Sequence, residues 1–142
     1  MGWKRTALSM VLVGGCIWCC GLVQRVYSEE QKADAGDCYK PVAPPHDLME
    51  AQDQHFEEIK DLLGQQGARR FRKLSIHANI LAELCNVNQY QSEEKDYKNW
   101  AIEARDLSLK LAKAGKDKDQ DAASELVREI HARCTSCHDK YN

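Results

Sequence analysis

The chain has 142 residues, of which 30% are charged and 7% are aromatic, a composition that favours one helical domain over a β-sandwich. Residues 1–28 contain three of the 20 basic residues and no acidic residue, so the rest of the chain carries 17 basic against 22 acidic residues, a net charge of −5. This balance argues against a nucleic-acid partner, which would need a basic surface.

Residues 1–28 predict a signal peptide for export. Lys4 and Arg5 precede the apolar run ALSMVLVGGCIWCCGLV, and a stretch suited to cleavage ends at Ser28. Two alternatives remain open: a lipoprotein signal with Cys16 as the lipidated residue, and a retained anchor, although the run is short of the roughly 20 residues that span a bilayer. We therefore expect a periplasmic or otherwise exported protein, bound to a membrane only if the leader is retained or lipidated.

Residues 29–45 are expected to form an irregular N-terminal arm, because EEQKADAGD is polar and PVAPP is unsuited to a helix interior. The folded domain is expected over residues 46–142. Four segments with helical periodicity follow one another there, separated by three short breaks.

The first helical segment covers about 46–63 and the second about 69–86, with GQQG between them. Ser92 is expected to be the N-cap of the third segment, and Gly115 is expected to end it. The fourth segment follows GKDKDQ and continues to the C-terminus. Residues at steps of three and four share one face of each helix. The predicted inward face of the first segment is Met49, Gln52, Phe56, Ile59 and Leu63, and that of the second is Phe71, Leu74, Ala78, Leu81 and Cys85. The predicted inward face of the third is Tyr97, Trp100 or Ala101, Ala104, Leu107, Leu111 and Ala114, and that of the fourth is Ala123, Leu126 or Val127, Ile130, Cys134, Cys137 and Tyr141.

The pattern as a whole predicts an all-α fold, an antiparallel up-down-up-down four-helix bundle preceded by the signal segment. The sequence contains no strand-like alternation, internal repeat or glycine-rich phosphate loop. The four segments have similar lengths, which favours one bundle over scattered helices.

Cys134, Cys137 and His138 form the pattern C-x-x-C-H close to the end of the chain. This pattern is the attachment signature of c-type haem. Attachment requires two thiols that add to the vinyl groups of the porphyrin and an imidazole that faces the iron, and these three side chains lie within about one helical turn. We therefore expect one covalent haem c, with His138 as the proximal iron ligand.

Three other interpretations of the motif remain open: a zinc site, a redox dithiol and a chance occurrence of the pattern. A zinc site would recruit His131 beside Cys134, Cys137 and His138, but four ligands along one helix wrap a tetrahedral ion poorly. A redox dithiol normally opens a helix, where the dipole lowers the thiol pKa, whereas this pair lies at the end of one.

Met49 is the candidate for the distal iron ligand. In an up-down-up-down bundle the end of the fourth helix lies beside the start of the first, so Met49 is expected to face His138 across the haem. The alternative is a methionine that only fills the core, as methionines on apolar helix faces commonly do.

The other histidines are expected to have structural or surface roles. His46 and His55 are rivals to Met49 as distal ligands, but the first lies where the helix begins and the second points elsewhere. His77 is expected to be a hydrogen-bonded structural histidine in the middle of the bundle. His131 lies nearly two turns before His138 and is expected at a boundary.

The remaining pocket is expected to be walled by apolar and aromatic side chains that exclude water. Arg133 or Lys140 is expected either to offset the haem propionates or to remain a solvated surface residue. The expected walls are Leu84, Tyr97, Trp100 and Ala101.

Cys38 and Cys85 predict a disulfide. Cys38 precedes the first helix and Cys85 ends the second, and antiparallel packing brings those ends together. The alternative is that Cys85 is a simple buried thiol.

Four helices with C-x-x-C-H on the last resemble the class II c-type cytochromes, the cytochrome c′ family, over the chain that follows the leader; only the haem motif is specific. LMEAQDQHFEEIK and HDKY are also similar to parts of the soluble four-helix cytochrome that holds b haem non-covalently, and that similarity places Met49 and His138 on the ligand positions. Class II members with a methionine there are six-coordinate electron carriers, whereas members with an apolar residue there are five-coordinate and bind gases. The resemblance also permits a homodimer. Cys38 and Cys85 depart from the family pattern.

The expected function is one-electron transfer between redox protein partners by an exported c-type cytochrome. The alternative is a five-coordinate haem protein that binds NO or CO as a sensor or scavenger. We do not expect an enzyme, because the sequence offers no nucleophile–base pair.

Overall fold

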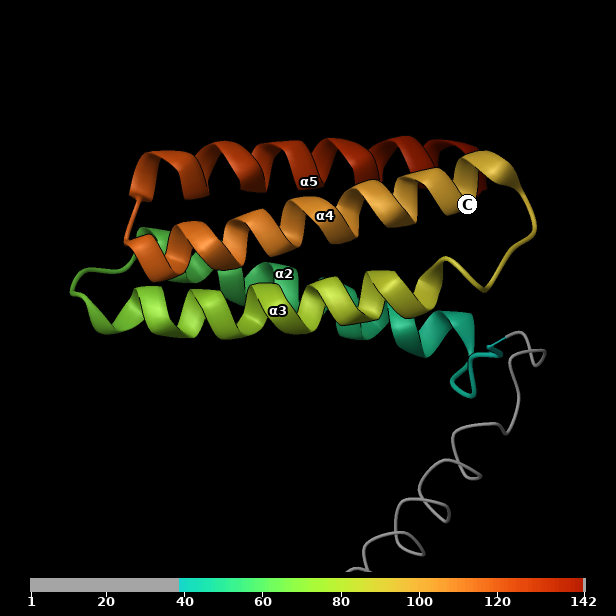
Figure 1. The fold of residues 1–142 in the computed structure, drawn as a ribbon, viewed down its shortest axis with the longest axis horizontal. Coiled ribbons are helices and arrows are strands. Elements are labelled where there is room, and N and C mark those ends of the chain that lie inside the picture. The colour runs from blue at the N-terminus through green and yellow to red at the C-terminus, as the bar shows by residue number, and fades with distance from the viewer. Residues whose placement is uncertain (1–38, 142) are drawn as a thin grey trace, which may run out of the picture. The chain divides into compact units, whose positions relative to one another are not determined.

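The computed structural model describes residues 39–141, which form four helices and no strand (Figure 1). The helices are α2 (Pro45–Gly64), α3 (Arg69–Asn88), α4 (Lys95–Asp117) and α5 (Gln120–Tyr141). The predicted all-α bundle is therefore confirmed. The predicted signal peptide, most of the predicted arm and Cys38 lie outside the described residues.

The helices pack in a closed cycle in which each contacts only its two neighbours. α2 packs on α3, α3 on α4, α4 on α5 and α5 on α2, and no Cα atom of α3 comes within 8 Å of one in α5. The α2–α5 pair is the least closely packed of the four. Figure 1 shows that the start of α2, the α3–α4 connection and the end of α5 lie at the same end of the bundle.

Each helix contributes one large, fully buried aliphatic side chain to the core. These are Ile59, Leu74, Leu111 and Ile130, each at most 1% exposed. All four lie on the predicted inward faces, and burial of such a side chain stabilises the fold by about 1.5–3 kcal/mol. These four side chains lie in the middle of the bundle and toward its far end, so other residues line the end at which α5 terminates.

α2 begins at Pro45, which the sequence places at the end of the irregular arm. Proline is compatible with the first position of a helix, where the backbone N–H has no intrahelical partner and φ is already suitable. The predicted boundary is therefore one residue late, and the prolines mark a helix start.

Gly115 does not end the third helix as predicted. α4 continues to Asp117, and Lys118 adopts the left-handed conformation, with φ of 59°, that terminates it. Gly115 instead lies buried against α3, where a Cβ atom would be 2.9 Å from Leu74 Cδ2 and 3.0 Å from the Phe71 carbonyl oxygen. The glycine is required for close approach of two helices.

Ser92 is not the N-cap of the third helix, so that prediction is also wrong. The N-cap is Glu94, which makes no side-chain capping bond, and α4 begins one residue later. The Ser92 hydroxyl accepts a hydrogen bond from the Glu94 N–H at 3.1 Å and so stabilises the preceding turn. By contrast, α5 has a side-chain cap, because Asp119 Oδ1 accepts a hydrogen bond from the Ala122 N–H at 3.0 Å.

Among the helices of residues 39–141, none combines the length and the apolar character that crossing a membrane requires.

Candidate functional site

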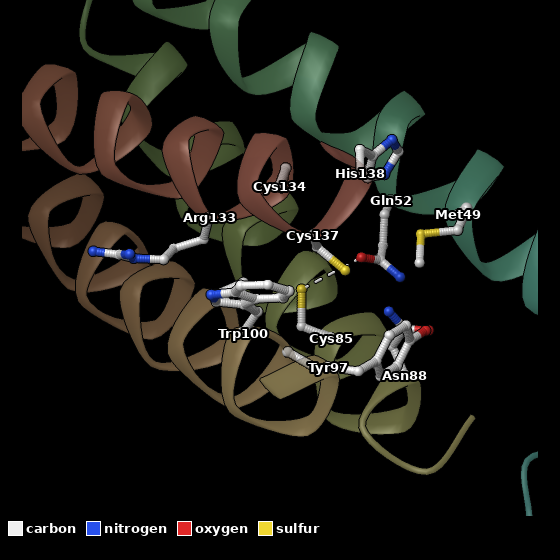
Figure 2. Close-up of a pocket in the computed structure, with 12 residues that line it drawn as sticks. Met49, Gln52, Cys85, Asn88, Tyr97, Trp100, Arg133, Cys134, Cys137 and His138 are labelled. Carbon is white, nitrogen blue, oxygen red and sulfur yellow. Dashed lines mark hydrogen bonds between the residues drawn. The ribbon is translucent and has the colours of Figure 1, made fainter. Parts of the chain in front are cut away.

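Three cavities at the bundle end where α2 begins and α5 ends share two lining residues, Met49 and His138. The innermost measures about 30 Å³ (Figure 2). The second, about 300 Å³, lies between α2 and α5, and the third, about 320 Å³, opens beside Pro45 and Tyr141. The larger two are at the lower limit of the usual size for small-molecule sites. The fold therefore brings both predicted iron ligands to one site.

The C-x-x-C-H motif lies on the last two turns of α5, with both thiols directed toward this site. Cys134 and Cys137 are partly buried and both line the innermost cavity. Burial raises the pKa of both thiols, and their mutual proximity raises that of Cys134 further. The thiols are therefore neutral at pH 7.

The opposite wall comes from α2 and α3. Met49 and Gln52, one helical turn apart on α2, are both partly buried and line the same two cavities. Gln52 Oε1 accepts a hydrogen bond from the Cys85 thiol, at an Sγ–Oε1 distance of 3.6 Å. Gln52 Nε2 is shut off from solvent and has no hydrogen-bond partner among the described residues.

The inner wall combines aromatic rings with one buried polar pair. The Tyr97 hydroxyl donates to Asn88 Oδ1 at 2.8 Å, and burial raises the pKa of this tyrosine. Tyr97 and Trp100 each make an edge-on ring contact with Tyr141 at the end of α5. Tyr97, Trp100 and Ala101 line the innermost cavity as predicted, whereas Leu84, one residue before Cys85 and therefore rotated by about 100° around α3, lines none of the three.

Charged side chains tie α5 to α4 beside the cavity. Arg133 forms an ion pair with Glu103 at 3.1 Å, and Lys140 pairs with Asp96. Asp96 also accepts a hydrogen bond from the Tyr141 hydroxyl at 2.6 Å. These two hydrogen bonds lower the pKa of Asp96 to about 2. Both predicted propionate partners thus have acidic partners in the structure, and Arg133 also lines the innermost cavity.

The other histidines lie as follows. His55 Nδ1 and His77 Nδ1 are 3.0 Å apart, which confirms His77 as a hydrogen-bonded structural histidine and gives His55 a partner across the α2–α3 interface. His46 is exposed near the start of α2 and lies beside the outer cavity. His131 stacks on Phe56 with ring centroids 6.2 Å apart, between α2 and α5.

The structure weighs against a zinc site and against a redox dithiol at Cys134 and Cys137. Within residues 39–141, no group of three or more His, Cys, Asp or Glu side chains is placed to hold a metal ion. The raised thiol pKa values oppose a redox dithiol, whose reactive form is the thiolate.

Cys85 is a buried thiol that forms no disulfide with any of the described residues 39–141. It has no disulfide route to α5, because disulfides need Cα atoms within about 7 Å and no Cα atom of α3 comes within 8 Å of α5. Because Cys38 lies outside the described residues, the Cys38–Cys85 disulfide stays a prediction.

No protein-family model, curated protein or solved structure matches this chain.

The side chains at this site fit a c-type haem in their chemistry. Two neutral thiols and an imidazole come from α5, and a thioether comes from α2. Ala101 and Ala104 contribute only small side chains to the inner wall, and the unpartnered amide N–H of Gln52 lies on the opposite wall. The sequence does not predict the hydrogen bonds that Gln52 and Asn88 make at the site. Gln52 gives a weak signal, because it is a polar residue on an otherwise apolar helix face, and Asn88 gives none.

Proposed function

We propose that this protein is an exported c-type cytochrome of the class II kind, which binds one covalent haem c and carries single electrons between redox protein partners. The observation that carries the proposal is that Cys134, Cys137 and His138 of α5 line one cavity together with Met49 of α2. Residues 1–28 would direct export, and the acidic chain would suit partners with a basic docking surface. The proposal includes no enzymatic activity, and it allows a homodimer.

Each residue has a defined task in this proposal. Cys134 and Cys137 would hold the haem through thioether bonds, and His138 and Met49 would bind its iron as the proximal and distal ligands. The haem supplies an iron that alternates between the ferric and ferrous forms. Methionine–histidine ligation favours the ferrous form and so raises the reduction potential.

The surrounding protein keeps water from the site and keeps the ligands in place. Tyr97, Trp100 and Ala101 provide the apolar inner wall. The Asp96 contacts with Lys140 and Tyr141 fix the last turn of α5, which carries His138. Two fixed ligands keep the geometry similar in both oxidation states, which is what an electron carrier requires.

The second candidate is a haem protein that binds NO or CO with Met49 unligated. Met49 favours it, because this side chain is only partly buried and borders the cavity of about 300 Å³ between α2 and α5, so close packing does not fix it at a ligating position. The two candidates share the haem and differ only at the distal ligand.

Haem attachment is tested by expressing the full chain in bacteria with the machinery for c-type haem maturation. The mass of the denatured protein should exceed that of the polypeptide by one haem. The Cys134→Ala/Cys137→Ala double variant should lose the haem, whereas the Cys85→Ala control should keep it. A colourless wild-type protein of polypeptide mass would contradict the proposal.

A further inference from the structure

Gln52 has a side-chain amide in which only the carbonyl oxygen has a hydrogen-bond partner among the described residues. Its Oε1 accepts a hydrogen bond from the Cys85 thiol, so the amide nitrogen is the end of the side chain that remains available in the cavity. Nε2 is buried and unpartnered. Figure 2 shows the amide between Cys85 and Met49, pointing into the pocket.

A buried N–H group without an acceptor destabilises the folded state, because it loses its hydrogen bonds to water and gains none in return. Folded proteins rarely keep such a group unless something in the functional state accepts from it. Asn88 lines the same cavity, but its Oδ1 accepts from the Tyr97 hydroxyl at 2.8 Å and no hydrogen bond joins it to Gln52 Nε2. The acceptor for Gln52 must therefore come from elsewhere in the cavity.

Met49 is the side chain placed to provide that acceptor. It lies three residues before Gln52 on α2, and residues at this spacing are neighbours on one helix face. Both residues line the innermost cavity and the cavity between α2 and α5. The methionine sulfur is a weak hydrogen-bond acceptor.

We propose that Gln52 is a positioning residue for the distal ligand, whose Nε2–H donates a hydrogen bond to the Met49 sulfur in the haem-loaded protein. This inference rests on the proposed function. The hydrogen bond holds the thioether in place and withdraws electron density from it. A weaker donor stabilises ferric iron less, so Gln52 favours the ferrous form.

The test compares Gln52→Leu with the wild-type chain in haem-loaded and haem-free forms, the latter expressed without the maturation machinery. Leucine removes the unpartnered donor, so the haem-free protein should keep or gain thermal stability. The haem-loaded variant should lose stability, because the bond to sulfur is gone. The ratio of reduced to oxidised protein at a fixed solution potential should fall by up to about tenfold, because the net free energy of one hydrogen bond sets the upper limit of the shift.

The matched control is Gln120→Leu. Gln120 also has a buried unpartnered atom, Oε1, but it begins α5 at the far end of the bundle. Its substitution should shift both forms in the same direction and leave the redox ratio unchanged. Gln52→Glu, which keeps the length but replaces the N–H donor with a carboxylate, should lower the redox ratio further than Gln52→Leu, because its negative charge also stabilises ferric iron.

Either of two results would overturn this inference alone. One is equal destabilisation of the haem-free and haem-loaded forms by Gln52→Leu, and the other is an unchanged redox ratio in a variant that retains methionine ligation. A wild-type chain that takes up no haem would overturn the proposed function and this inference with it.

Discussion

At the scale of single residues, the three thiols of the site differ in accessibility although they line one cavity. Cys85 is 3% exposed, and burial, with the nearby Cys134, raises its pKa to about 12. Cys134 and Cys137 are partly exposed and their pKa values are also raised. A small reagent can thus reach Cys134 and Cys137 in the folded chain, whereas it cannot reach Cys85.

We predict that alkylation of the haem-free protein by iodoacetamide at pH 8 modifies Cys137 first and Cys134 next, and leaves Cys85 unmodified until the chain unfolds. The reagent attacks thiolates, and a thiol with a pKa of about 12 offers almost none at this pH. Peptide mass mapping over time measures the three rates. Modification of Cys85 at the rate of Cys137 would show that the packing around α3 differs from the structure.

The contact between His55 and His77 has an electrostatic consequence that can be tested. Burial and the charge of His77 lower the pKa of His55. The unfolded chain therefore binds a proton more readily than the folded protein below the ordinary histidine pKa of about 6.5. Stability from this pair is complete above that pH and is lost as the pH falls through the lowered pKa.

We predict that the free energy of unfolding decreases between pH 7.5 and pH 5.5, and that His77→Gln makes this decrease shallower. Urea denaturation at several pH values measures the slope. His46→Gln, which changes an exposed histidine, serves as the control and should keep the wild-type slope. An identical slope in wild type and His77→Gln would show that the pair does not titrate as argued.

At the scale of elements, the sequence predicts which face of each helix is buried better than it predicts where the helix begins and ends. Ile59, Leu74 and Leu111 follow from periodicity alone, because burial of one helix face determines them. Gly115 does not, because a glycine just before a polar loop has the same sequence signature whether it ends a helix or permits close packing. Only the distance between α3 and α4 separates the two cases.

Gly115→Ala should destabilise the bundle by about 1–3 kcal/mol, the usual cost of overpacking. The new Cβ would meet backbone atoms of α3, the Phe71 oxygen at 3.0 Å and the Ser75 nitrogen at 3.1 Å, and these cannot move aside as a side-chain end can. Chemical denaturation of the two proteins measures the difference.

Gly64→Ala is the control, because a Cβ at Gly64 meets nothing within 4 Å. It should be neutral or slightly stabilising through the better helix propensity of alanine. A Gly115→Ala protein as stable as Gly64→Ala would refute the close-approach role.

At the scale of the whole molecule, the bundle has one loosely packed seam, between α2 and α5, and the candidate ligands lie on its two sides. The up-down-up-down topology was enough to predict this meeting of Met49 and His138 from sequence. The cavities themselves were not predictable, because they depend on how closely each pair of helices packs.

We predict that backbone amides in the first turns of α2 and the last turns of α5 exchange with deuterium faster in the haem-free protein than those of the α3–α4 pair. Segments with fewer packing contacts open at lower free energy. Haem loading should slow exchange in both segments, because it would join them across the seam. Hydrogen exchange read by mass spectrometry compares the two forms, and unchanged exchange on loading would argue against a group bridging α2 and α5.

The optical spectrum of the purified haem-loaded protein, recorded oxidised and reduced, tests the account most directly. The account predicts a low-spin, six-coordinate ferric spectrum with a sulfur-to-iron band that disappears in Met49→Leu, a change that keeps the apolar volume. A high-spin ferric spectrum that shifts on addition of NO and is the same in Met49→Leu would contradict it.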